Sequence, residues 1–323
     1  MAITISRRHA LLGGAFGAAA LLRPASATAQ TATAVTGPRP TLYDRPVGDL
    51  RVHVLLDGYF DLGKGLVTNI ADDVYAANLG AAFQDPAAPI RLPISAHLVQ
   101  GPDGITLIDA GSGSAFGPTA GRLAAALDPL GLSPADITRV VLTHMHPDHI
   151  GGLVTADGAA VFANAALHVN DPELAFWTDE AIAASVPADS QPFFSLARTV
   201  AAAYGERVTP FTGEADLGGG LSIVQTPGHT PGHCAVRVSS GDAQLLIWGD
   251  AAAIAALQFS HPDSGIAFDA DGALAAQTRR RLLDMASTDR IAVAGTHLPF
   301  PGVGHVARRD AEFAWVPETW VIS

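Results

Sequence analysis

THMHPDH, at residues 143–149, places three imidazoles and one carboxylate within six positions of the chain. Divalent cations bind such sets of nitrogen and oxygen donors. Residues 139–142 (RVVL) predict a short buried strand before this motif, and residues 150–153 (IGGL) predict a tight turn that opens a helix. Four donors this close together cannot easily all face one ion. The spacing therefore suggests two metal ions, with the first two histidines on one and Asp148 and His149 angled toward its neighbour.

Four further apolar stretches predict short strands, and each is followed by an aspartate or a histidine. One of them, residues 221–225, leads into TPGHTPGH at residues 226–233, where two Pro-Gly pairs force tight turns and hold an imidazole at the end of the strand. Five strand ends that each deliver a donor predict one shared site at the edge of a sheet. The other three stretches are ITLID at residues 105–109, LLIWGD at 245–250 and IAVAGTH at 291–297.

The order of these motifs resembles the metallo-β-lactamase superfamily, in which they run Asp, His-x-His-x-Asp-His, His, Asp, His. The resemblance spans about residue 50 to the C-terminus. Within the superfamily the sequence is most similar to methyl parathion hydrolase and its lactonase and arylesterase relatives. Residues 109–123 and HLPFPGVGH at 297–305 carry that closer resemblance. It implies an α/β (α+β) fold, a single-domain four-layer αββα sandwich with the metals in the cleft between its halves.

The resemblance also implies a role for each donor. Two divalent cations, zinc by preference with manganese, cobalt or iron as alternatives, would share a hydroxide that attacks a carbonyl or a phosphorus. Asp250 would bridge the cations, and Asp109 would accept a hydrogen bond from a ligand imidazole, the alternative for Asp109 being an ordinary polar turn residue. With Asp148, these carboxylates would take part in catalysis. The first cation would be held by His144, His146 and His229, and the second by Asp148, His149 and His297.

Aromatic side chains are expected to form the pocket for the leaving group. Phe116, Trp177, Phe193 and Phe194 match pocket positions of the methyl parathion hydrolase group, although aromatic residues are more often core residues. Because no basic cluster lies nearby in the sequence, a neutral and flat leaving group is favoured over an anionic thioester. The predicted substrate is a small neutral ester, namely an organophosphate triester, a lactone or an aryl ester.

Other classes of function remain as alternatives to this dinuclear hydrolase. A quorum-signal lactonase or a thioester hydrolase of the same fold is the nearest. A mononuclear iron oxygenase would not need Asp148, His149 and His297 together. A metal-binding scaffold without catalysis would not need a bridging carboxylate at Asp250.

Composition agrees with a folded enzyme that acts on a small molecule. The chain has 323 residues, of which 48% are hydrophobic, enough for one large domain with a substantial core. Its formal charge of −12 argues against a nucleic-acid partner, while a homodimer stays open. The lone Cys234 cannot form an internal disulfide. We expect an inert buried thiol there rather than a metal ligand, because Asp250 fills the bridging position.

Residues 1–29 predict an export signal. SRRHALL at residues 6–12 is typical of a twin-arginine signal, an apolar run covers residues 11–22, and ATA at residues 27–29 has the form of a cleavage site. The apolar run is short and rich in Gly and Ala, so no membrane anchor is expected to remain. The predicted location is periplasmic or secreted, the alternative being a cytosolic chain with a basic start.

The remaining segments predict a simple organisation. Residues 30–48 are expected to be a flexible lead-in to a hydrolase domain at residues 49–323, and His233 and His305 are expected to be structural. Residues 50–56 predict an edge strand, and residues 60–92 a long irregular loop over the site. Helices are predicted at residues 119–130, from 133, from 171, and at 272–285 with Arg279, Arg280 and Arg281 on the exposed side.

Overall fold

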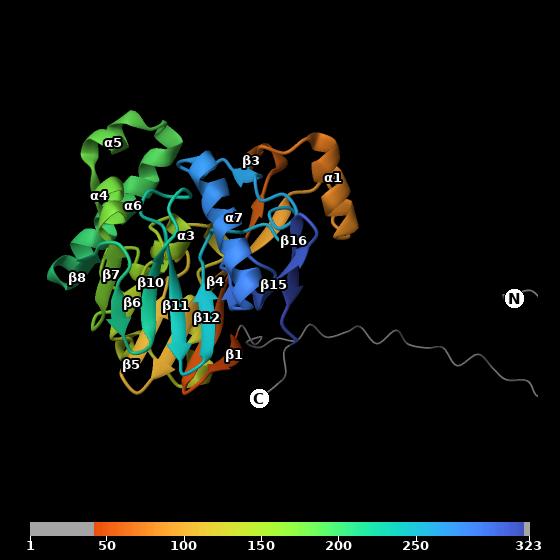
Figure 1. Cartoon of the computed structure of the whole chain (residues 1–323). Helices are drawn as coiled ribbons and strands as arrows, with labels where there is room; N and C mark the ends of the chain where they lie inside the picture. The colour runs from red at the N-terminus through yellow and green to blue at the C-terminus, as the bar shows by residue number, and fades with distance from the viewer. Residues whose placement is uncertain (1–41, 320–323) are drawn as a thin grey trace, which may run out of the picture. The chain divides into compact units, whose positions relative to one another are not determined.

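Two seven-stranded sheets form the centre of residues 42–319, the part of the chain that the computed structural model describes (Figure 1). The first sheet has the order β1-β2-β4-β5-β6-β7-β8, and the second has the order β16-β15-β14-β12-β11-β10-β9. The first contains β1 (Leu42–Val47), β2 (Leu50–Leu62), β4 (Ile90–Gly101), β5 (Gly104–Ile108), β6 (Arg139–Val141), β7 (Ala166–Asn170) and β8 (Val208–Phe211). The second contains β9 (Asp216–Gly218), β10 (Leu221–Gln225), β11 (Cys234–Ser240), β12 (Ala243–Ile247), β14 (Ala292–Ala294), β15 (Val303–Arg309) and β16 (Glu312–Pro317).

Helices cover the outer face of each sheet (Figure 1). A small ribbon of β3 (Val67–Thr68) and β13 (Gly265–Ile266) lies outside both sheets. The α-helices are α1 (Asp72–Ala81), α2 (Leu123–Ala126), α3 (Pro147–Ile150), α4 (Asp171–Thr178), α5 (Glu180–Ser185), α6 (Gln191–Tyr204) and α7 (Gly272–Asp289). The 3-10 turns are η1 (Lys64–Leu66), η2 (Gly117–Thr119), η3 (Asp128–Leu130), η4 (Pro134–Asp136), η5 (Gly151–Leu153), η6 (Ala188–Ser190) and η7 (Gly205–Arg207).

Uninterrupted apolar strands produce the layers. Successive side chains of a strand point to opposite faces, so a strand that is apolar throughout must be covered on both sides. In β6, Val141 packs between the sheets and Val140 packs under the helices of the first sheet. In β12, Leu245 packs between the sheets, whereas Leu246 packs with α7. The predicted four-layer αββα fold is confirmed.

Strand direction explains why the donor-bearing segments share one edge. In the first sheet β5 and β6 are parallel, and in the second β12 and β14 are parallel. Strand β10 is antiparallel to β11, which is antiparallel to β12, so β10 and β12 run in the same direction. The carboxyl ends of these strands therefore meet at one edge within each sheet.

The beginning of the domain was placed too late in the sequence. Residues 42–47 of the expected lead-in form β1, which pairs antiparallel along its whole length with β2. Strand β1 is therefore the edge strand, and the strand predicted at residues 50–56 lies inside the sheet and continues to Leu62. The predicted signal at residues 1–29 lies outside the described residues.

Residues 60–92 were wrongly expected to be irregular. They contain the end of β2, strand β3, helix α1 and the start of β4. Tyr75 and Leu79, one helical turn apart on α1, are buried and pack with Leu62 and Leu257. This pair of contacts holds a helix whose other residues are mostly small or polar.

The helices predicted on either side of residue 130 are shorter than expected. Asp57 accepts hydrogen bonds from the backbone N–H groups of Gly121 and Leu123, so residues 119–130 divide into η2, α2 and η3. The helix expected from residue 133 is the single turn η4, with a Ser133–Asp136 capping box. The helix expected from residue 171 is α4.

Arg279 was wrongly placed on the exposed side of α7. Its guanidinium is buried and donates to the carbonyl oxygens of Ala251, Pro262 and Ser264. Those residues belong to the segment that follows β12, so Arg279 fastens this segment to the helix. Arg280 and Arg281 form surface contacts instead.

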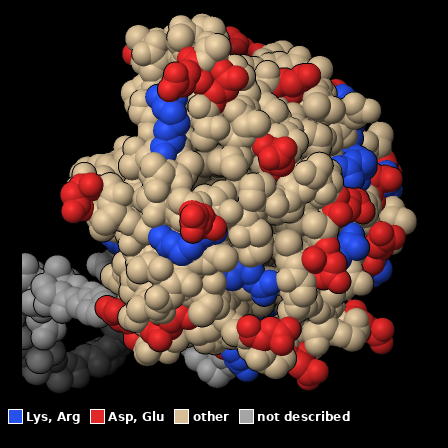
Figure 2. Space-filling view, turned by 90° about the vertical axis from the view of Figure 1, so that its left-hand side faces the viewer, with Lys and Arg blue, Asp and Glu red and all other residues tan. Residues whose placement is uncertain are grey.

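Basic and acidic side chains are mixed on the face of the domain shown in Figure 2. No helix within residues 42–319 is long and apolar enough to cross a bilayer. In Figure 2 the Lys and Arg side chains are scattered among Asp and Glu and form no continuous basic patch.

Candidate metal centre

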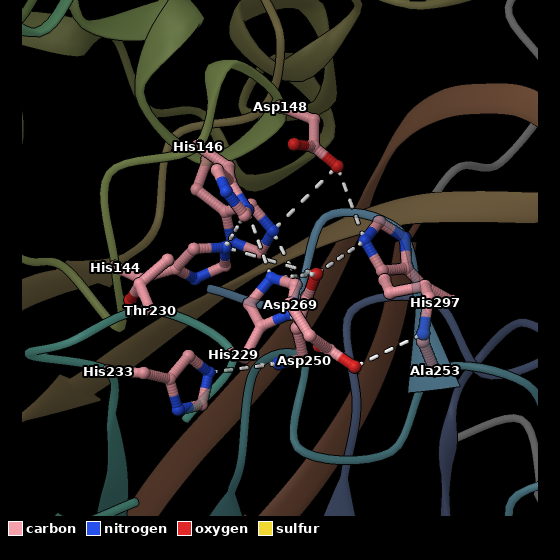
Figure 3. A network of polar contacts seen from close by, with 12 residues as sticks. His144, His146, Asp148, His229, Thr230, His233, Asp250, Ala253, Asp269 and His297 are labelled. Carbon is pink, nitrogen blue, oxygen red and sulfur yellow. Dashed lines mark hydrogen bonds and ion pairs between the residues drawn. The ribbon is translucent and has the colours of Figure 1, made fainter. Parts of the chain in front are cut away.

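Seven buried side chains from both sheets gather at the shared strand edges (Figure 3). Their donor atoms form two sets, within each of which all atoms lie within 4.8 Å of one another. We refer to His144, His146 and His229 as the first donor group and to Asp148, His149 and His297 as the second donor group. Asp250 belongs to the first set and also reaches the second. The structure thus brings together every residue that the sequence predicted as a metal ligand.

The first donor group consists of three imidazoles whose inner nitrogens face one another. His146 Nδ1 lies 3.0 Å from His144 Nε2 and 2.9 Å from His229 Nε2. Asp250 Oδ2 lies 3.4 Å from His229 Nε2 and 3.9 Å from His144 Nε2. These four atoms surround a point at which one cation could sit.

The second donor group combines a carboxylate with two imidazoles. Asp148 Oδ2 lies 3.2 Å from His297 Nε2 and 3.8 Å from His149 Nε2. Asp250 reaches this group with both oxygens, because its Oδ2 is 3.1 Å from His297 Nε2 and its Oδ1 is 3.2 Å from His149 Nε2. Asp250 is therefore the one carboxylate that lies between the two groups.

The outer nitrogens of the imidazoles are bound to acceptors. His149 Nδ1 donates to Asp109 at 2.8 Å, and His297 Nδ1 donates to the carbonyl oxygen of Pro93 at 2.7 Å. His229 Nδ1 donates to Asp269 at 2.7 Å. Since each of these rings donates from its outer nitrogen, its inner nitrogen faces the centre and would offer its lone pair to a bound cation.

The arrangement of lone pairs fits a cation. Thr143 Oγ1 donates to Asp109 and so accepts from His144 Nδ1, which leaves the inner nitrogen of His144 without a proton. The lone pairs of His144 and His229 both converge on His146 Nδ1, which can carry only one proton. The buried atoms His149 Nε2 and Asp250 Oδ1 lie 3.2 Å apart, and neither forms a hydrogen bond. A divalent ion in each position would satisfy these atoms.

Charge is distributed unequally between the groups. Burial and neighbouring imidazoles hold the pKa of His144 and His146 well below the ordinary value. Burial by itself would lower the pKa of His297, but the carboxylates of Asp250 and Asp148 outweigh it and raise that pKa to about 10. The first donor group is thus a set of neutral imidazoles, whereas the carboxylates of Asp148 and Asp250 stabilise positive charge in the second group, which a bound cation would supply in place of a proton.

Asp109 supports the second group from behind. It accepts hydrogen bonds from the backbone N–H and the hydroxyl of Thr143, in addition to the one from His149. Its φ of 60° lies in the left-handed region, which is uncommon for a residue with a side chain, and these three hydrogen bonds hold it there. Its position agrees with the orienting role that the sequence suggested.

His233 and Cys234 lie just outside the centre. His233 Nδ1 donates to the carbonyl oxygen of Thr226, and its Nε2 accepts from the backbone N–H of Asp250. Burial lowers the pKa of His233 to about 3, so the ring is neutral and supports the backbone of Asp250. Burial raises the pKa of the Cys234 thiol well above its ordinary value. His305 is exposed on β15, a strand that carries none of the donors.

A cavity of about 720 Å³ opens onto the centre. Its lining includes donors of both groups and, beside them, mostly apolar side chains. Phe116 and Phe193 line it, whereas Trp177 and Phe194 do not. For Trp177 and Phe194 the predicted pocket position is wrong, because both are buried in the core among α4, α6 and the first sheet. The Trp177 ring touches His146 from behind, with the ring centres 5.3 Å apart.

Two further aromatic residues of this cavity were not predicted from the sequence. Phe60 packs edge-on against His297, with ring centres 5.2 Å apart, and Phe268 lies 6.5 Å from His146. Phe60 fell in the segment expected to be irregular, and Phe268 in an unassigned loop. No Lys or Arg is among the lining residues in the described part of the chain.

Three acidic residues with buried side chains were also not predicted: Asp57, Glu173 and Asp269. Asp57 lies within β2 at a shift in its pairing with β4, and Asp269 lies in a loop. Glu173 lies in the first turn of α4, a position that favours acids near helix N-termini for local reasons alone. Only the packed structure shows that these carboxylates point inward.

Over residues 89–297 the chain matches the family model of the metallo-beta-lactamase superfamily, and it belongs to that superfamily. Among solved structures it is similar to AidC, a dizinc quorum-quenching lactonase in complex with a product, N-hexanoyl-L-homoserine. That likeness has a TM-score of 0.82 and 26% identity, and it covers 87% of this chain and 98% of that chain. It is also similar to AbOPH, a hydrolase in the beta lactamase superfamily, with a TM-score of 0.83, 28% identity, and coverage of 88% and 100%.

A relative identified by sequence is also a probable metallo-hydrolase, and it matches over a shorter span. The chain is 30% identical over 184 residues to a probable metallo-hydrolase of Mycobacterium tuberculosis, Rv2300c. This match covers 48% of the chain and 55% of the relative, so it spans little more than half of that protein. The closer resemblance to methyl parathion hydrolase stays a prediction.

Proposed function

We propose that this protein is a dinuclear metal-dependent hydrolase of a small neutral ester, with a lactone or an aryl ester favoured over an organophosphate triester. One observation carries the proposal. Two donor groups share Asp250 at the bottom of a largely apolar cavity, and no Lys or Arg is among the described residues that line it. Such a cavity suits an uncharged substrate with an apolar substituent.

The two donor groups would each hold one divalent ion, with Asp250 between them. Zinc is favoured because five of the seven donors are imidazoles, and manganese, cobalt or iron are alternatives. When bound, such a pair of ions activates water for attack at neutral pH and polarises the oxygen of the ester that is cleaved. That AidC is a dizinc lactonase supports this choice.

The chain's own residues orient and enclose the reacting groups. Asp109, Asp269 and the Pro93 carbonyl fix the rotation of three ligand rings through their outer nitrogens. Phe60 and Phe268 stand over His297 and His146, where they would contact the substrate and exclude bulk water. Because no Lys or Arg among the described lining residues could bind an anionic carrier group, thioesters of acidic carriers are disfavoured.

The test combines elemental analysis with a substrate panel. Protein purified without added metal should contain two divalent ions per chain, and a stoichiometry near one with full activity would refute the dinuclear proposal. The kcat/KM values should be highest for dihydrocoumarin, phenyl acetate or an acyl-homoserine lactone. A highest value for a glutathione thioester or a cephalosporin would refute the substrate class while leaving the metal centre intact.

We also propose that residues 1–29 direct export, as the twin-arginine pattern predicts. Mass spectrometry of protein from the native cell envelope should find an N-terminus near Gln30. Replacing Arg7 and Arg8 with Lys should retain the precursor in the cytoplasm. Unchanged export of that variant would contradict the assignment.

A further inference from the structure

Glu173, on α4, is a buried carboxylate that accepts four hydrogen bonds. Its Oε1 accepts from the backbone N–H of Met145 at 2.9 Å and from Trp177 Nε1 at 2.7 Å. Its Oε2 accepts from Thr230 Oγ1 at 2.7 Å and from the backbone N–H of Gly232 at 2.9 Å. Only 1% of the residue is exposed. Each oxygen of the Glu173 carboxylate therefore accepts two hydrogen bonds inside the protein.

Two of the segments bound by Glu173 carry the first donor group. Met145 lies between His144 and His146 in the loop after β6, and Thr230 directly follows His229 in the loop after β10. These loops come from different sheets, so their relative position is not set by strand pairing. One carboxylate thus ties together the two loops from which all three imidazoles of the first donor group project.

The loop after β10 packs directly onto the start of α4. A side chain added at Gly232 would lie 2.3 Å from the backbone nitrogen of Glu173, so only glycine allows this approach. No Lys or Arg forms an ion pair with Glu173 within residues 42–319. A buried carboxylate with no cationic partner costs stability, which makes mere filling of space a poor reason for its presence.

We infer that Glu173 is a positioning residue that sets the spacing of the first donor group and thereby the affinity of the first metal position. The inference rests on the proposed metal centre. The second donor group has no hydrogen bond to Glu173, and Asp109 and Pro93 support it instead. Loss of the carboxylate should therefore weaken one metal position selectively.

The test variant is Glu173→Gln, which keeps the size of the side chain. Its amide has one acceptor oxygen, so one pair of donors must face an NH₂ group. Thr230 can rotate its hydroxyl to accept, whereas the N–H groups of Met145 and Trp177 cannot. The amide nitrogen is thus expected toward Thr230 and Gly232, which would release the loop that holds His229.

Asp57→Asn is the matched control. Asp57 is also fully buried, and it too accepts four hydrogen bonds, from Gly121, Leu123 and twice from Ser112. None of these donors lies in a loop of the first donor group. Both variants should lose thermal stability, but only Glu173→Gln should change metal affinity.

Zinc affinities of the full chain would be measured by competition with a chromophoric chelator. Wild type should bind two ions, and Glu173→Gln should bind one of them about 10- to 100-fold more weakly with the other unchanged. In a His229→Ala background, which already lacks the first position, Glu173→Gln should have no further effect. In a His297→Ala background it should show its full effect.

Two outcomes would overturn the inference: wild-type affinity at both positions in Glu173→Gln, or an equal loss at both. If that variant does not fold, Thr230→Val removes one of the four donors at nearly constant volume. It should weaken the same position by a smaller factor, and unchanged affinity in Thr230→Val would overturn the inference as well. A wild-type protein that binds no metal would instead refute the proposed function.

Discussion

The two donor groups differ in charge and in the way the fold supports them. The first is made of three imidazoles on loops from both sheets, and Asp269, Thr143 and Glu173 hold those loops and rings. The second contains a carboxylate, and its two rings donate hydrogen bonds to Asp109 and to a backbone carbonyl. Both positions take ligands from both sheets, but Glu173 ties together the two loops of the first, whereas the second is held by Asp109 and by the hydrogen bond from His297 to Pro93. Metal affinity at the two positions should respond to different residues.

The largest expected effect comes from Asp250, the residue that joins the groups. Asp250→Asn should keep the fold and weaken both positions, because an amide cannot supply a negative charge to two cations. Turnover should fall at least about 100-fold, or roughly 3 kcal/mol of activation free energy. Steady-state kinetics at matched metal content would measure it.

Asp242→Asn is the control for that experiment, since Asp242 is exposed in the turn between β11 and β12. It should behave as wild type. If Asp250→Asn at matched metal content also had wild-type turnover, Asp250 would have no part in the reaction and the two groups would have to act independently.

An intermediate effect on metal affinity is expected from the residues that accept hydrogen bonds from the outer imidazole nitrogens. Asp269→Asn removes the negative charge opposite His229 and leaves one amide oxygen for His229 and the backbone N–H of Ile266. Asp109→Asn does the same for His149 and Thr143. Each should weaken its own metal position about 10- to 100-fold and spare the other. Competition titrations with zinc would show which position is lost. The same position weakened in both variants would break the distinction between the groups.

The smallest effect is expected at the cavity wall. Phe268→Ala should raise KM for aryl esters several-fold with little change in kcat, because the ring contacts the substrate equally in the ground and transition states. Trp177→Ala should instead lower the free energy of unfolding by about 3–5 kcal/mol, since Trp177 is a core residue. A rise in KM for Trp177→Ala without loss of stability would show that Trp177 contacts the substrate.

Much of this centre could be predicted from local sequence. Each ligand follows an apolar strand, and Pro and Gly next to the histidines limit how the chain can turn, so donor identity and order were readable. Only two of the four aromatic residues predicted for the pocket line the cavity. Phe116 and Trp177 look alike in sequence, but Phe116 lies on a loop over the cavity and Trp177 faces inward from α4. Which face of a short helix is buried depends on what packs against it.

Residues 60–92 show the same limit in the fold. Helix α1 has only Tyr75 and Leu79 buried, too few for a helical pattern to stand out. Strand β1 was missed because its residues are mostly half-buried and include Pro46, which is tolerated at the edge of a sheet. Helix α1 is completed by packing with Leu257, far along the chain, and β1 by pairing with β2, the strand that follows it.

Local sequence sufficed to predict the donor-bearing strands and turns, because strand periodicity and tight turns are short-range properties, whereas the four-layer fold and the ligand roles were implied by the family resemblance. Tertiary structure alone decided that Asp57, Glu173, Asp269 and Arg279 are buried and which loops they join. A lone charged residue carries no sequence signal of its environment, and the free energy that keeps it buried comes from hydrogen bonds to segments far away in the chain. The first donor group is assembled across two sheets by such contacts, so its geometry could not be predicted before the sheets were packed.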